Sequence, residues 1–423
     1  MLQRSINKRA LVLLFINGVI GAGILGLPSK AFKLAGVYSL AALLLCALAV
    51  FVIILCFAEV SSRFEKTGGP YLYAFSAFGP LPAFLTGWLL LLSRFITYAA
   101  LINLLVTYLS VFFPWFLWPS VRIISILGIT ILLVAVNYIG IKSSTRVNNF
   151  FTIAKLLPLL LFVVVGFFFF IPENFEIKQT VNFSSFSSTV LLWIFAFGGF
   201  ESVLVNTGEV KNPGRNLPIA LLLATAVIAS VYLLIQLVSI GTLTSLGNSE
   251  TPLADAAYLF FGKTGAAIIG LGALFSITGT LNAIMLVGSR LPYAFSEENQ
   301  FPKIFSFIHP KYKTPIWSLL FFAAITVIVS ITNSFLYAAT ISAIIRLMVY
   351  GIVCIALIRL RQKDNFKANF FKLPFGNVIA IVGIGITGWL LASAKMNELR
   401  DVSIAIAVGF VIYFSVQFFG KKK

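Results

Sequence analysis

The sequence predicts an all-α membrane protein with twelve transmembrane helices. Of its 423 residues, 60% are hydrophobic and only 10% are charged. A soluble domain of ordinary composition carries roughly a quarter charged residues to cover its surface. This chain could not cover itself against water, whereas a bilayer is the solvent that suits it.

The individual spans follow from apolar runs, because a helix needs about 20 apolar residues to cross the hydrocarbon. The first run is expected to be a transmembrane helix rather than a cleaved signal peptide, since further spans follow it. The connecting loops are short, so no soluble domain is expected. The predicted spans are 10–27, 36–58, 83–111, 122–141, 150–171, 188–207, 217–243, 264–289, 314–332, 335–358, 374–394 and 402–420.

The positive charges predict the orientation in the membrane. With the N-terminus inside, the cytoplasmic segments would hold about three times as many Lys and Arg residues as the outer segments. We therefore expect a multi-pass protein of the cell membrane with both termini in the cytoplasm. The net charge of +18 is explained by this topology, so nucleic acid is not an expected partner.

The residues that usually carry enzyme or metal chemistry are scarce. The chain has a single histidine, His309, and its three cysteines, Cys46, Cys56 and Cys354, lie in apolar runs. A His- or Cys-rich metal site and a disulfide framework are both unexpected. A membrane-embedded enzyme would need clustered catalytic groups at depth. We expect no catalytic residue, metal or cofactor.

Two spans contain glycine-rich interruptions. The first span holds glycines from Gly18 to Gly26, and the sixth holds Gly198 and Gly199 followed by Glu201. Small residues can simply let helices pack closely, but a mid-span carboxylate is costly unless it is paired or faces water. Interrupted helices at matching positions in two halves are typical of transporters built from inverted repeats.

Such breaks have a defined chemistry. Main-chain groups that lose their helical partners at this depth must line a cavity. Freed N–H groups at the start of a half-helix favour an anion, and freed carbonyls favour a cation. A site that offers both at the bilayer midplane suits a zwitterion.

At these residues the chain resembles the amino acid–polyamine–organocation transporter family over nearly its whole length. The similar motifs are Gly21-Ala22-Gly23-Ile24, Gly68-Gly69-Pro70-Tyr71, Phe197-Gly198-Gly199-Phe200-Glu201 and the string from Glu209 to Pro218. The resemblance implies the leucine-transporter fold, with 5+5 inverted repeats and two extra helices. The first repeat would be 1–171, the second 172–360, and the two peripheral helices would lie in 361–423.

The resemblance also implies a substrate site at the unwound main chain. The substrate carboxylate would meet the N–H groups of Ala22, Gly23 and Ile24, and the ammonium would meet carbonyls near Val19, Phe195 and Gly198. The side-chain pocket would be apolar. The implied substrate-binding residues are Val19, Ile20, Gly21, Ala22, Gly23, Ile24, Phe195, Gly198 and Gly199.

Lys155 lies in the fifth span, where the resemblance implies a lysine that replaces the ion of sodium-coupled relatives. A lysine removed from water gives up its proton more readily, so we expect Lys155 to couple transport to protons. It would contact the first break, with Ser276 or Thr278 nearby. The alternative is a lysine that extends to the cytoplasmic interface.

Other charges allow two interpretations each. Arg94, Glu201 and Arg346 would form a structural intramembrane charge network, or Arg94 would meet an anionic part of the substrate. Charges at two cytoplasmic helix ends would form inner-gate pairs or ordinary interfacial clusters. These residues are Glu59, Arg63, Glu209, Lys211 and Arg215.

The expected function is therefore secondary active transport of an amino acid, with proton-coupled uptake of a neutral or hydrophobic substrate by alternating access. The expected partners are the amino acid, protons and the lipid bilayer. The alternatives are an exchanger, a carrier of cationic amino acids or polyamines, and a sensor that binds without transport. A channel would need a filter segment or charge rings, which the sequence lacks. The oligomeric state is left open.

Overall fold

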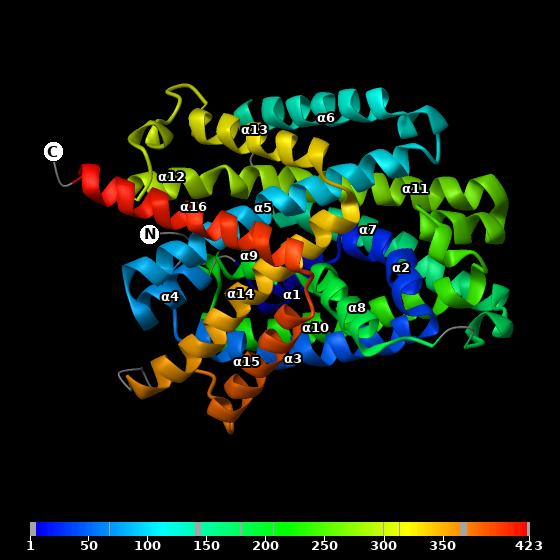
Figure 1. Cartoon of the computed structure of the whole chain (residues 1–423), viewed down its shortest axis with the longest axis horizontal. Coiled ribbons are helices and arrows are strands. Elements are labelled where there is room, and N and C mark those ends of the chain that lie inside the picture. Colours follow the sequence, from blue (N-terminus) through cyan, green and yellow to red (C-terminus); the bar gives the residue numbers. More distant parts are fainter. Residues whose placement is uncertain are drawn as a thin grey trace.

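The computed structural model describes residues 6–66, 68–139, 145–177, 180–205, 207–298, 300–312, 314–363 and 370–420, with the backbone alone at 22, 145–154 and 419–420. Helices dominate these ranges (Figure 1). The β-structure among the described residues is one isolated bridge between Ile6 and Val210. The prediction of an all-α protein is confirmed.

The first half of the chain contains nine α-helices among its described residues. They are α1 (Lys8–Val19), α2 (Ala22–Ala35), α3 (Ser39–Ser62), α4 (Pro70–Phe78), α5 (Pro80–Leu109), α6 (Pro119–Ile139), α7 (Thr145–Gly166), α8 (Phe183–Phe197) and α9 (Phe200–Leu204).

The second half contains seven α-helices among its described residues. They are α10 (Pro213–Thr242), α11 (Pro252–Gly288), α12 (Arg290–Glu297), α13 (Ile316–Thr332), α14 (Phe335–Gln362), α15 (Gly376–Ala392) and α16 (Met396–Gly420). Short 3-10 helices occupy several connections: η1 (Gly36–Tyr38), η2 (Pro114–Leu117), η3 (Phe167–Phe169), η4 (Pro172–Phe175), η5 (Thr207–Glu209), η6 (Leu246–Asn248) and η7 (Lys303–Ser306).

Every predicted span overlaps at least one of these helices. In the described ranges, eight helical stretches are long and apolar enough to cross a membrane. Three shorter apolar helices cover Lys155–Phe169, Ile316–Thr332 and Gly376–Ala392. Many crossings are therefore supported, while the exact number of twelve and the inverted repeats remain predictions.

The structure adds helices where the sequence predicted loops. The segment before the eighth predicted span forms the first part of α11, which turns at Phe261 and Gly262. Gly262 has φ +58°, a conformation that glycine adopts without a steric penalty. The connections also contain α4 and α12, which are too short to cross a bilayer.

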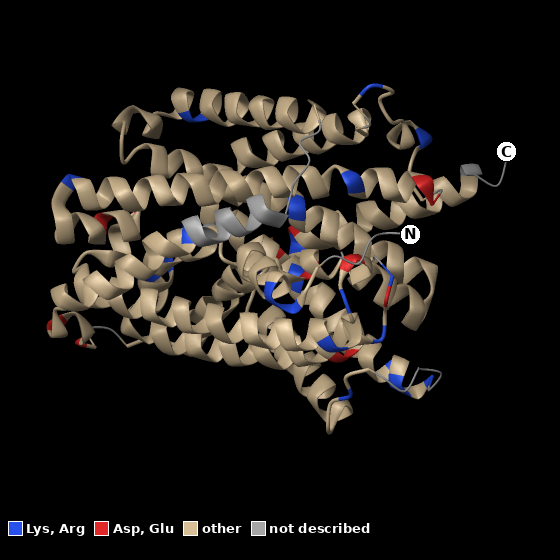
Figure 2. Ribbon diagram, turned by 180° about the vertical axis from the view of Figure 1, so that it is seen from behind, with Lys and Arg blue, Asp and Glu red and all other residues tan. Residues whose placement is uncertain are grey.

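The interior of the helix bundle is built around α5 and α14, which pack against each other and are buried over most of their length. Helices α6 and α16 have few buried residues. In Figure 1, α6 lies along the upper edge of the bundle. Figure 2 shows few charges along most of the helices, and more of them toward one end of the long axis.

Candidate functional site

The first break separates α1 from α2. Helix α1 ends at Val19 and α2 begins at Ala22, so Ile20 and Gly21 stand outside both helices. Both have non-helical backbone, with ψ 102° at Ile20 and φ −142°, ψ −147° at Gly21. No described side chain caps the start of α2. The predicted interruption of the first span is present, with freed N–H groups at the α2 terminus.

The second break separates α8 from α9 at Gly198 and Gly199. Gly198 is extended, with ψ 152°, and Gly199 has φ +124°, which strongly favours glycine. Glu201 stands in the first turn of α9, and its Oε2 accepts a hydrogen bond of 2.9 Å from the Gly199 N–H. A side chain of the protein therefore already occupies the anion position at this half-helix.

The two breaks meet, main chain against main chain. A Cβ added to Gly199 would lie 2.1 Å from the carbonyl oxygen of Gly18. A Cβ added to Gly23 would lie 2.7 Å from the Cα atom of Ala196. Real Cβ atoms do not approach other atoms so closely, so both positions require glycine. The glycines predicted from the sequence are what allow the two interrupted helices to touch.

Tyr232 of α10 links the ends of α1 and α8. Its buried hydroxyl lies 3.2 Å from the Val19 oxygen and 3.0 Å from the Ala196 oxygen. In an unbroken helix each of these carbonyls would accept from the residue four positions later. Tyr232 was not predicted from the sequence, where it is one tyrosine within a long apolar run.

Lys155 of α7 contacts the first break, as predicted. Its buried Nζ donates to the carbonyl oxygens of Asn17 at 3.1 Å and Ile20 at 3.0 Å. These carbonyls lie at the C-terminal end of α1, where the helix dipole favours a cation. The geometry differs from that of a lysine reaching toward the interface, because Nζ is held by main chain inside the bundle.

The two hydroxyl residues predicted beside Lys155 fall on different sides of α11. Ser276 is buried and lines a small cavity with Lys155 and Gly21. Thr278 is exposed, because two residues correspond to about 200° of rotation around a helix. Thr280, four residues after Ser276, lies at the first break: its hydroxyl oxygen is 3.7 Å from where a Cβ added to Gly21 would be.

The site is closed in this conformation. One cavity lies beside Lys155, and a second, apolar one lies beside Val19, Phe197 and Phe200. Each has room for about one water molecule. An amino acid would enter only after the helices around the breaks move.

The predicted intramembrane charge network forms next to the second break. Arg94 of α5, Glu201 of α9 and Arg346 of α14 are all buried. Glu201 Oε1 lies 3.5 Å from Arg346 Nη1, and Arg94 donates a hydrogen bond to Ser202 Oγ. The Tyr350 hydroxyl donates to Glu201 Oε2 at 3.3 Å. The three charges therefore lie together, which the sequence could only propose.

Arg346 places its guanidinium directly on the second break. Its Nε donates to Ser93 Oγ at 3.2 Å and its Nη2 to Thr97 Oγ1 at 3.1 Å, which fixes the side chain against α5. A Cβ added to Gly198 would lie only 1.4 Å from Arg346 Nη1. The expectation of a wholly apolar lining is therefore wrong, since a cation covers Gly198.

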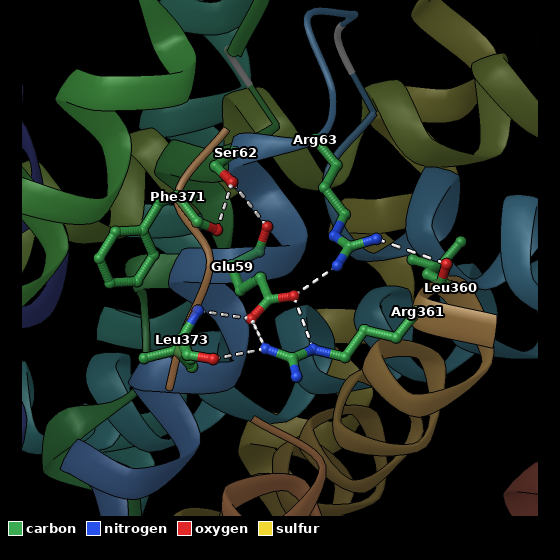
Figure 3. Close-up of polar contacts among 7 residues, drawn as sticks. All are labelled: Glu59, Ser62, Arg63, Leu360, Arg361, Phe371 and Leu373. Carbon is green, nitrogen blue, oxygen red and sulfur yellow. Dashed lines mark hydrogen bonds and ion pairs between the residues drawn. The ribbon is translucent and has the colours of Figure 1, made fainter. Parts of the chain in front are cut away.

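A second charge cluster lies at the cytoplasmic ends predicted for the second and tenth spans (Figure 3). Glu59, which is fully buried, pairs with Arg63 as predicted and also with Arg361 of α14. Arg361 Nε donates to Glu59 Oε1 at 2.8 Å, and Nη2 donates to Oε2 at 2.5 Å. The Leu373 N–H adds a bond of 2.9 Å to Oε2. This cluster joins α3 to α14 and to the segment before α15.

The other predicted inner-gate residues show main-chain contacts. Ile6 N donates to the Glu209 oxygen at 3.0 Å, and Lys211 N donates to the Ile6 oxygen at 2.9 Å. These bonds fasten the residues before α1 to the connection between η5 and α10. Main-chain hydrogen bonds therefore connect the segment that holds Glu209 and Lys211 to the residues just before α1.

Comparison with known proteins agrees with this architecture. A family model described as "Amino acid permease" matches residues 6–419. The chain is 29% identical to the methylthioribose transporter of Bacillus subtilis (strain 168), and 27% identical to the branched-chain amino acid permease BcaP of the same organism. Each match covers 98% of this chain and 93% of the relative. It is 28% identical to the large neutral amino acids transporter small subunit 2 of Rattus norvegicus, over 98% of this chain and 80% of the relative.

Proposed function

This chain belongs to the amino acid permease family, and on that premise we propose that it is a secondary active transporter that moves an amino acid together with protons across the cell membrane. The observation that carries the proposal is the meeting of two interrupted helices inside the bundle. Main-chain groups freed at such breaks form the substrate sites of transporters that work by alternating access.

The two half-helix starts are not equivalent, which supports one orientation of the substrate. The Gly199 N–H at the start of α9 is already bonded to Glu201. The N–H groups of Ala22, Gly23 and Ile24 at the start of α2 have no described side-chain cap. The substrate carboxylate is therefore assigned to α2, and the ammonium to the carbonyls at the ends of α1 and α8.

Lys155 supports coupling to protons. Its Nζ donates hydrogen bonds to two carbonyl oxygens at the end of α1. A metal cation bound at this position would need the same oxygens as ligands. When the amine loses its proton, the charge-assisted bonds to Asn17 and Ile20 weaken. The end of α1 is then free to move, which links protonation to the conformation of the first break.

The cation at Gly198 argues against one of the alternatives, a carrier of cationic amino acids or polyamines. A cationic amino acid or a polyamine would place a positive charge near Arg346 at low dielectric, where like charges repel strongly. The relatives named for branched-chain and large neutral amino acids also support a zwitterionic substrate.

The test is uptake of labelled amino acids by purified protein in liposomes, with and without an inward proton gradient. Transport is expected for at least one amino acid, with accumulation above equilibrium only when the gradient is present. A proton carrier that collapses the gradient should abolish accumulation and leave downhill flux. Binding without net flux would identify a sensor and refute the proposal.

A further inference from the structure

The charge cluster at the second break is unbalanced. Two guanidinium groups, Arg94 and Arg346, surround a single carboxylate, Glu201, and all three side chains are buried. Arg94 donates to Ser202, which is neutral. The cluster therefore carries one positive charge in excess, in a part of the protein where an uncompensated charge is costly.

The hydrogen bonds show which guanidinium nitrogen of the cluster lacks an acceptor. Glu201 Oε2 is already used by the Gly199 N–H and the Tyr350 hydroxyl. Its Oε1 is 3.5 Å from Arg346 Nη1, longer than a normal charge-assisted hydrogen bond. Among the described residues Nη1 has no hydrogen-bond acceptor, although it is buried. A donor that carries charge and lacks an acceptor marks a place for an anion.

The charge cluster of Glu59, Arg63 and Arg361 offers a comparison within the same chain. It also joins two arginines to one glutamate, but there Arg361 engages both oxygens of Glu59 and donates a further bond of 2.7 Å to the Leu373 oxygen. Figure 3 shows this arrangement. Arg361 therefore engages both oxygens of its carboxylate, whereas Arg346 Nη1 approaches one oxygen of Glu201, at 3.5 Å.

The donor lies beside the second break, where the substrate is proposed to bind. Arg346 Nη1 lies against Gly198, and Gly23 of the α2 terminus packs against Ala196, two residues away. Two residues span at most about 7 Å. A substrate whose α-carboxylate lies at the start of α2 could therefore reach Nη1 with a side chain of one or two carbons that ends in a second acceptor group.

We propose that Arg346, backed by Arg94, forms an anion subsite beside the Gly198–Gly199 break that takes the side-chain carboxylate of an acidic amino acid. The carboxylate would draw Nη1 away from its long contact with Glu201 Oε1 and balance the cluster. Arginine suits this task because its fork of donors matches a carboxylate. The inference rests on the proposed function and names its substrate class.

The first test uses the unaltered protein in proteoliposomes and compares pairs of equal shape. Glutamate and aspartate are expected to be taken up with at least tenfold higher kcat/KM than glutamine and asparagine, with leucine as a further reference. Uptake in which the amides or leucine equal or exceed the acids would overturn the inference and leave the proposed function standing. Absence of uptake of any amino acid would overturn both.

Variants then locate the preference. Arg346→Gln is expected to remove the tenfold preference for glutamate over glutamine, and Arg346→Lys to retain part of it. Arg400→Gln, which removes an exposed arginine paired with Asp401, should leave the preference unchanged. Replacing chloride by gluconate should have no effect. If uptake of neutral amino acids instead requires chloride, the anion at Arg346 is chloride and the inference fails.

Discussion

Gly199→Ala tests the contact between the two breaks. Gly199 has φ +124°, and an added Cβ would lie 2.1 Å from the Gly18 carbonyl oxygen. Holding alanine in such a conformation costs about 1–3 kcal/mol, and overpacking a tight contact costs about 1–3 kcal/mol more. The added Cβ would meet a main-chain oxygen, which cannot turn away as a side chain can, so one of the two helices has to move. A combined cost of about 4 kcal/mol corresponds to roughly a thousandfold loss of affinity.

The assay is equilibrium binding of a labelled substrate to purified protein, with uptake in liposomes as a second readout. The matched control is Gly388→Ala in α15, where no described atom lies within 4 Å of the added Cβ. The control should bind as the unaltered protein does, since alanine is the better helix residue. If Gly199→Ala binds within threefold of the unaltered protein, the two breaks do not form one site.

Three further predictions follow from single contacts. Lys155→Ala should abolish proton-driven accumulation in liposomes; undiminished accumulation would refute the coupling role. Glu59→Gln leaves the partly buried Arg361 with a neutral partner. Breaking this pair should cost about 3–5 kcal/mol and lower the melting temperature, whereas Arg400→Gln should not; equal melting temperatures would contradict the cluster's structural importance. Tyr232→Phe removes the hydroxyl that donates to the Val19 and Ala196 carbonyls. Substrate affinity should then fall about tenfold, the equivalent of one hydrogen bond. Unchanged binding would show that the contact between Tyr232 and the two breaks does not support the site.

The helices and both breaks could be predicted because their signals are local. Long apolar runs require helices in lipid, and paired glycines before a mid-span carboxylate are hard to explain in a continuous helix. Gly198, Gly199 and Glu201 stand together in the sequence and act together in the structure. The position of Lys155 came from resemblance, and the structure shows its contacts with Asn17 and Ile20.

The contacts made across the bundle could not be predicted, because hydropathy does not give the rotation of a helix that is apolar on all sides. This is why Thr278 was expected beside Lys155 although it is exposed, and why the lining was expected to be apolar although Arg346 covers Gly198. Tyr232 joins residues that are 213 and 36 positions away. Nothing local in the sequence marks such a residue.

The kink within α11 shows the same limit on a smaller scale. Gly262 is one of 31 glycines, and only the structure shows that it takes a positive φ and ends one helix before the next begins. Glycine permits such a turn but does not require it. The helical segment that precedes it was therefore assigned to a loop.

Main-chain groups freed at the two breaks are proposed to hold both charged ends of an amino acid. The most direct measurement is competition at equilibrium between the best labelled substrate and two of its analogues, one without the amino group and one with the α-carboxylate esterified. Each analogue is expected to compete at least a hundredfold more weakly than the parent amino acid. If either analogue competes as well as the parent, the breaks do not recognise a zwitterion and the account is wrong.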